Sequence, residues 1–119
     1  MTRNRLVIVA VVLVAFFAIA GYAIYSNQHR GGQNVSVTVT VTGAKSMSPS
    51  QLTAHQDDNV TIYVSSDTNG EVHLHGYDVH FSCTAGQVTS HTFKADKTGS
   101  FDIEWETTGA PLGTFMVIP

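Results

Sequence analysis

The chain has 119 residues, a net charge of −3 with histidine neutral, and 43% hydrophobic residues, which suits one small domain with its own core. Beyond residue 25, one arginine and three lysines stand against nine acidic residues, a balance of −5. This balance disfavours nucleic acid as a partner, because phosphate binding needs a basic patch. The single cysteine, Cys83, excludes a disulfide within the chain.

An unbroken apolar run covers residues 6–25, and Arg3 and Arg5 precede it. Twenty helical residues span about 30 Å, the thickness of the hydrocarbon layer of a membrane. Residues 1–25 are therefore predicted to be a single-pass signal anchor, or a signal peptide cleaved after Ala20. Both interpretations place the remainder outside the cytoplasm, on the membrane or secreted, because the arginines stay inside. Residues 26–34 are polar and aperiodic, which predicts a linker to a domain over 35–119.

The first half of that domain predicts strands. Residues 35–41 alternate valine with serine or threonine, which is typical of a half-buried strand. A turn signal around Pro49 precedes a short strand over 52–56, and residues 60–64 alternate again. Asn69-Gly70 is a strong hairpin signal. Residues 71–81 read as one long strand bent at Gly76, since a glycine inside a strand often marks a bulge.

The second half predicts three more strands, over 88–94, 101–105 and 114–118. In the middle one, Phe101, Ile103 and Trp105 alternate with acidic residues that should form a solvated outer stripe, namely Asp102, Glu104 and Glu106. About seven short strands, with no helical period beyond residue 25, predict an all-β fold. The expected architecture is an antiparallel two-sheet sandwich.

His73 and His75 are the most informative pair of polar residues. On a strand they share one face, roughly 6–7 Å apart at Cα. Two neutral imidazoles so placed can reach one metal ion such as copper(II), with a third ligand from elsewhere. The candidates for that third ligand are His91, Asp78, Glu71 and residues 107–112. In the alternative interpretation His75 stacks against Trp105, and His73 is solvated.

Three other kinds of side chain could bind a metal. Cys83 follows His80 by three residues, but a lone thiol at a strand end also suits a small apolar filler. His91 is in phase with Phe93, which indicates either a core histidine or a ligand. Two methionines could be soft ligands for copper(I) or simply packing residues, namely Met47 and Met116. No nucleophile elbow, phosphate loop or zinc-protease motif occurs, so we expect no enzyme.

The order of these signals from Val35 to Ile118 resembles the cupredoxin-like family, particularly its small exported single-domain members. The resemblance implies a Greek-key β-sandwich, and it covers nearly all of the chain beyond the linker. The segments that carry it are His75-Gly76-Tyr77, Ala85-Gly86, Thr92 to Asp96, Gly99-Ser100-Phe101 and Gly113 to Val117.

The same resemblance implies that the blue-copper ligands are missing. His75 resembles the upstream histidine of blue-copper members. The positions that resemble the cysteine, second histidine and methionine of a short ligand loop carry Trp105, Thr108 and Pro111 instead. A blue-copper centre needs a thiolate and two imidazoles. We therefore expect no blue-copper electron carrier, with Trp105 filling the space of the metal.

Two functions remain at this point. In the first, a membrane-tethered extracytoplasmic cupredoxin-like domain binds a copper ion loosely through His73 and His75, for sensing, buffering or hand-over. In the second, the same fold is a metal-free interaction module for a protein partner in the cell envelope. Both include contact with the membrane through the N-terminal segment.

Overall fold

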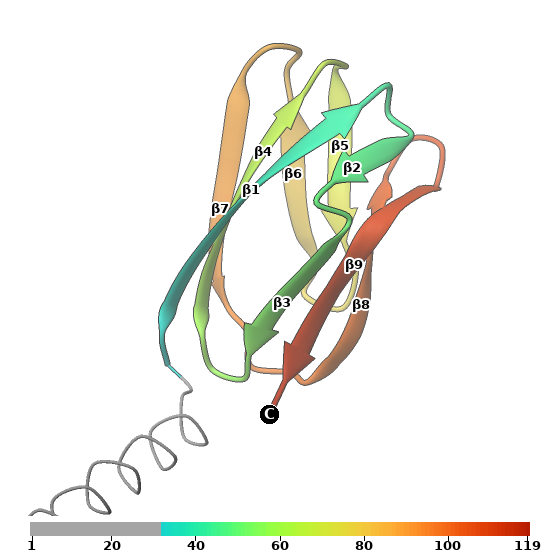
Figure 1. Ribbon diagram of the computed structural model, residues 1–119. Coiled ribbons are helices and arrows are strands. Elements are labelled where there is room, and N and C mark those ends of the chain that lie inside the picture. Colours follow the sequence, from blue (N-terminus) through green and yellow to red (C-terminus); the bar gives the residue numbers. More distant parts are fainter. Residues whose placement is uncertain (1–31) are drawn as a thin grey trace, which may run out of the picture. The chain divides into compact units, whose positions relative to one another are not determined.

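The computed structural model describes residues 32–119, which form nine β-strands and no helix (Figure 1). The predicted all-β sandwich is confirmed for this region. The anchor predicted over 1–25 and most of the predicted linker lie outside the described residues. Within residues 32–119, no helix is long and apolar enough to cross a membrane.

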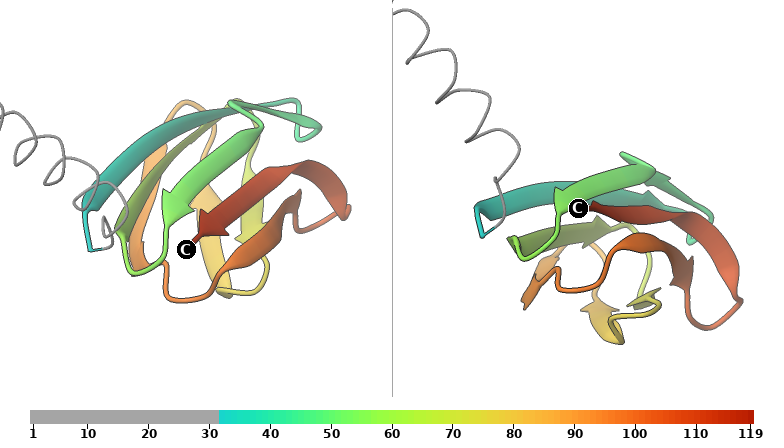
Figure 2. Two further views of the ribbon diagram at one scale, coloured as in Figure 1. Left: turned by 60° about the horizontal axis from the view of Figure 1, so that its bottom comes forward. Right: turned by 90° about the horizontal axis from the view of Figure 1, so that it is seen from below.

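The strands form two sheets that pack face to face (Figure 2). One sheet has the order β2-β1-β4-β7 and the other the order β3-β9-β8-β5-β6. The bounds are β1 Asn34–Thr42, β2 Ser46–Ser48, β3 Gln51–His55, β4 Asn59–Ser66, β5 Gly70–Leu74, β6 Val79–Cys83, β7 Val88–Lys94, β8 Gly99–Trp105 and β9 Ala110–Ile118.

Two of the pairings are parallel, which the antiparallel prediction missed. β1 runs parallel to β4, with Val35 opposite Val60, and β3 runs parallel to β9, with Leu52 opposite Phe115. Side-chain alternation has the same period of two in both kinds of ladder, so it cannot report strand direction. The sandwich is therefore mixed, although most of its pairings are antiparallel.

The hairpin predicted at Asn69-Gly70 is wrong, because the chain changes sheets there. β4 pairs with β1 and β7, whereas β5 pairs with β6 and β8. The Asn69 side chain instead accepts a hydrogen bond from the backbone N–H of Ala85, 2.8 Å away. Gly70 lies so close to the indole of Trp105 that a Cβ would overlap it. This glycine allows a close approach rather than a two-residue turn.

The long bent strand predicted over residues 71–81 is also wrong. Residues 75–78 form a turn, and β5 and β6 on either side of it pair antiparallel. The backbone of Gly76 is left-handed, with φ of 82°, and a Cβ there would overlap the ring of Phe101. A glycine within an apparent strand thus marks a chain reversal here, not a bulge.

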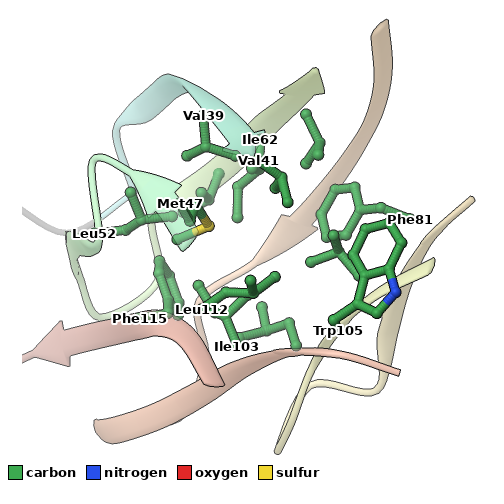
Figure 3. Packing of buried hydrophobic residues seen from close by; sticks show 14 of the residues in the cluster. Val39, Val41, Met47, Leu52, Ile62, Phe81, Ile103, Trp105, Leu112 and Phe115 are labelled. Carbon is green, nitrogen blue, oxygen red and sulfur yellow. The ribbon is translucent and has the colours of Figure 1, made fainter. Parts of the chain in front are cut away.

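The core lies between the sheets, where the alternating apolar faces meet (Figure 3). Every second residue of β1, β4 and β8 points inward, as the sequence predicted. Trp105 is 3% exposed and belongs to this core, so its predicted inward orientation is confirmed. The largest fully buried apolar side chains are Phe81, Phe115, Leu74, Val39, Val41, Val60, Val64 and Val72.

One buried carboxylate stabilises the end of the sandwich where β1 begins. Asp58 is fully buried, and its two oxygens accept hydrogen bonds from the backbone N–H groups of Gln33 and His55, at 3.0 and 2.9 Å. Its own carbonyl accepts from the N–H of Ala95. The aspartate therefore satisfies backbone groups from three separate segments, which offsets the cost of burying its carboxylate.

Candidate metal centre

His73 lies in the middle of β5 and points away from the core, because its neighbours Val72 and Leu74 point inward. His75 begins the following turn, and its N–H donates to the carbonyl of Asp102 on β8, 2.9 Å away. The two imidazole rings lie with centroids 4.2 Å apart. The prediction that these two side chains lie on one face is confirmed.

The reversal at residues 75–78 brings a third histidine to the pair. In the β5–β6 register His80 stands directly opposite His73. Their rings stack with centroids 4.1 Å apart and an angle of 9° between planes. A straight strand would have sent His80 to the opposite face, so the sequence interpretation missed it. His73 is thus flanked by an imidazole on each side.

The acidic stripe of β8 runs alongside these rings. β8 pairs with β5, and Glu104 stands opposite His73. The twist of the sheet brings diagonal partners together. Glu104 Oε1 lies 2.6 Å from His75 Nε2, and Glu106 Oε2 lies 3.0 Å from His73 Nδ1. Two of the three acidic residues expected in a solvated stripe therefore face histidines instead.

Two further carboxylates surround His80. Asp78 Oδ1 lies 3.0 Å from His80 Nε2 and 3.3 Å from His73 Nε2, and Glu71 contacts His80 Nδ1. The hydrogen bond with Asp78 raises the pKa of His80, and Glu71 adds to this. The bonds from His80 and then His73 lower the pKa of Asp78. In the absence of metal, a proton on His80 therefore stabilises the cluster, and a metal ion there must displace it.

Two sets of three side chains in this cluster could each hold a metal ion. One set comprises His73, His80 and Glu106, and the other comprises His73, His75 and Glu104. Within each set, the three ligand atoms lie within 4.8 Å of one another. Imidazole nitrogen with carboxylate oxygen suits a divalent ion such as copper(II) or zinc, and no sulfur belongs to either set.

His73 carries the feature that most favours a ligand. Its side chain is only 14% exposed, and its Nδ1 forms no hydrogen bond, despite lying 3.0 Å from Glu106 Oε2. Within residues 32–119, this is the single buried side-chain nitrogen or oxygen without a hydrogen-bond partner. The nearby Glu106 carboxylate and the two neighbouring imidazoles are groups that bind divalent cations. The residues present therefore fit a metal ion.

His91, the predicted third ligand, lies elsewhere. It is on β7 of the other sheet, where it is exposed and its ring packs edge-on against Phe81 with centroids 5.2 Å apart. As predicted, His91 alternates in step with half-buried Phe93 along the strand. However, β7 is an edge strand, and His91 is exposed to solvent there. Of the other candidates for the third ligand, Asp78 and Glu71 contact the histidines. Residues 107–112 contribute to neither set of possible ligands.

The three positions that resemble the blue-copper loop lie away from the histidine cluster. Trp105 packs in the core beside Gly70, and Pro111 and Thr108 are exposed, with Thr108 Oγ1 accepting from the N–H of Ala110. The predicted stacking of His75 on Trp105 is wrong, because consecutive residues of β8 face opposite ways. Trp105 faces the core, and His75 contacts Glu104 outside.

The sulfur atoms also lie apart from the cluster. Cys83 is 7% exposed, and its Sγ lies 3.5 Å from the carbonyl of Phe81, which fits the interpretation as an apolar filler. Burial raises the pKa of its thiol and so disfavours the thiolate that a metal requires. Met47 is buried in the core and Met116 is half-buried on β9.

Three solved structures resemble this chain at a TM-score of 0.60. The first is described as a copper binding protein in the apo form, with 14% identity over 72% of this chain and 96% of that one. The second is a chain from a heme-copper terminal oxidase dimer, with 15% identity over 97% of both. The third is a blue copper oxidase from Nitrosomonas europaea, with 15% identity over 73% of this chain and 39% of that one.

These likenesses define the class of the domain. Together with the two-sheet sandwich, they support the cupredoxin-like fold expected from the sequence. No protein-family model and no curated protein matches the chain. The comparison with the blue copper oxidase covers about two-fifths of that protein, so the likeness to it concerns one of its parts.

Proposed function

We propose that this chain is a membrane-anchored, extracytoplasmic cupredoxin-like domain that binds a copper ion through a cluster centred on His73. The observation that carries the proposal is that two sets of possible ligands converge on His73, whose side chain is only 14% exposed. Copper binding by proteins of similar fold supports the choice of metal. Nitrogen and oxygen ligands favour copper(II) over copper(I), which prefers sulfur. The role is binding, for buffering, sensing or hand-over, rather than catalysis.

Titration of the full-length chain with copper(II), followed by calorimetry, tests the metal proposal. We expect saturable binding, and His73→Ala should weaken it by about 100-fold or more, because a ligand common to both sets is lost. His55→Gln is the matched control, since His55 lies on β3 and belongs to neither set. Binding that His73→Ala leaves unchanged, or no binding at all, would refute the proposal.

The location is a separate part of the proposal, and the sequence supports it. The apolar run over residues 6–25 follows two arginines, and no other segment of that kind occurs in the chain. Fractionation should find the chain in the membrane, and protease added to the outside of intact cells should remove the C-terminal domain. Intact mass distinguishes the anchor from a product cleaved after Ala20. A soluble chain inside the cell would refute this part.

A second candidate is a metal-free module that docks on a membrane complex. One observation favours it: the likeness to a chain of a terminal oxidase structure covers 97% of both chains. Native electrophoresis of membranes from the source cells should then show the chain migrating with terminal oxidase activity. Migration that persists in His73→Ala, together with no copper binding, would favour this role over the first. Migration as a free chain would exclude it.

A further inference from the structure

The histidine cluster contains two overlapping places for one ion. We propose that a single metal ion occupies either an inner position, formed by His73, His75 and Glu104, or an edge position, formed by His73, His80 and Glu106. His73 is a ligand in both positions. This inference rests on the proposed function, because it concerns how the same cluster holds its metal.

The two positions are distinct because His75 and His80 each belong to only one set of possible ligands. The ring centroids of His75 and His80 are 4.2 and 4.1 Å from that of His73, and no set of possible ligands within residues 32–119 contains both. His75 is matched with Glu104 of β8, and His80 is matched with Glu106, the residue that follows β8. The cluster therefore offers two three-ligand sites instead of one larger site.

The two positions cannot be filled together. A neutral imidazole has one nitrogen lone pair, so His73 can bind one ion at a time. Occupancy of one position thus excludes the other, and the cluster binds one equivalent of metal.

The positions differ in access and in strength. His75 and His80 have similarly exposed side chains, at 44% and 41%, but His80 lies on β6, at the edge of its sheet. The two carboxylates differ more, because Glu106 is 44% exposed and Glu104 is 28% exposed. The lone pairs of an imidazole lie in the ring plane, so stacked His73 and His80 must turn before both can reach one ion. The tilt of 46° between His73 and His75 needs less movement. The edge position is therefore the weaker site and the point of entry.

Four variants of the full-length chain test this arrangement with copper(II) alone: His73→Ala, His75→Ala, His80→Ala and the His75→Ala/His80→Ala double variant. We expect one equivalent bound by the unmodified chain. Loss of the weaker position should lower the affinity by less than about twofold, because the binding constants of exclusive positions add. His80→Ala should therefore bind nearly normally, and His75→Ala should bind more weakly, with a changed copper(II) EPR spectrum. The double variant should fall to the level of His73→Ala.

Carboxylate variants supply a second measurement that preserves side-chain size. Glu104→Gln should weaken binding as His75→Ala does, and Glu106→Gln should resemble His80→Ala. Asp102→Asn is the matched control, since Asp102 lies on the same strand and belongs to neither set. Circular dichroism of each variant checks that it is folded.

Three results would overturn the two-position inference while leaving copper binding intact. They are two equivalents bound, loss of all binding in His75→Ala alone, and a double variant that binds as well as His75→Ala. By contrast, absence of binding by the unmodified chain would overturn both proposals, and binding unchanged in His73→Ala would move the site elsewhere.

Discussion

At the scale of single residues, Trp105 shows how closely the core of this sandwich is packed. The indole is 3% exposed and occupies space that a Cβ at Gly70 would need. Filling that volume with an aromatic ring contributes apolar burial to the core, about 25 cal/mol for each Å².

The closeness of Gly70 to Trp105 makes a prediction about stability. Gly70→Ala should lower the free energy of unfolding by about 1–3 kcal/mol, because the added methyl group overpacks the indole. The same substitution in a Trp105→Phe background should cost less, since the smaller ring leaves room. Urea denaturation of the unmodified chain, the two single variants and the double variant measures the cost of Gly70→Ala in each background. Equal costs in the two backgrounds would show that the indole is not the obstacle.

At the scale of elements, the turn between β5 and β6 decides where the histidines lie. The Tyr77 hydroxyl donates to the carbonyl of Lys97, 2.6 Å away, and accepts from the N–H of the same residue at 2.9 Å. Lys97 Nζ in turn donates to the carbonyl of Gly76 at 2.8 Å and lies 5.4 Å from the centroid of the Tyr77 ring. This clasp fastens the turn to the segment between β7 and β8.

Removing the hydroxyl should loosen that clasp without disturbing the ring. Tyr77→Phe keeps the aromatic contacts with Phe93 and Phe101 but removes both hydrogen bonds to the backbone of Lys97. Because these groups are exposed and can bind water instead, we expect the free energy of unfolding to fall by about 0.5–1.5 kcal/mol. Tyr63→Phe is the control, because Tyr63 is 39% exposed on β4, and a change within about 0.5 kcal/mol is expected there. Equal effects of the two substitutions would contradict the role of the clasp.

At the scale of the whole molecule, the sandwich separates sulfur from imidazole. Cys83 is buried and Met47 lies in the core, whereas His73 and its two neighbours line the outer face of the sheet. A β-sheet one residue thick thus lies between the thiol and the proposed metal site. Copper bound outside this sheet meets nitrogen and oxygen only, and that ligand set differs from a blue-copper centre.

This separation predicts the colour of the copper-loaded protein. Addition of one equivalent of copper(II) should give only the weak visible absorption of nitrogen and oxygen ligands, without an intense thiolate-to-copper band. Cys83→Ala should leave the spectrum and the copper affinity unchanged. An intense visible band that disappears in Cys83→Ala would mean that the thiol reaches the metal.

Local patterns in the sequence determined the strands, the core and part of the site. Alternation along residues 35–41, 60–64 and 101–105 predicted which side chains are buried, because the strand period of two fixes facing before any partner is known. The same rule placed His73 and His75 together. These features depend only on neighbours in the chain, so the sequence alone determines them.

Only the tertiary structure decided which strands meet and in what direction. His80 reached His73 through the reversal near Gly76, and Glu106 reached it because β8 lies beside β5. The parallel pairings and the change of sheets after Asn69 arose in the same way. Register between distant strands depends on how complementary faces pack, and no local pattern records it. The sequence thus placed His73 and His75 on one face, and the fold added His80 and Glu106 to complete the cluster.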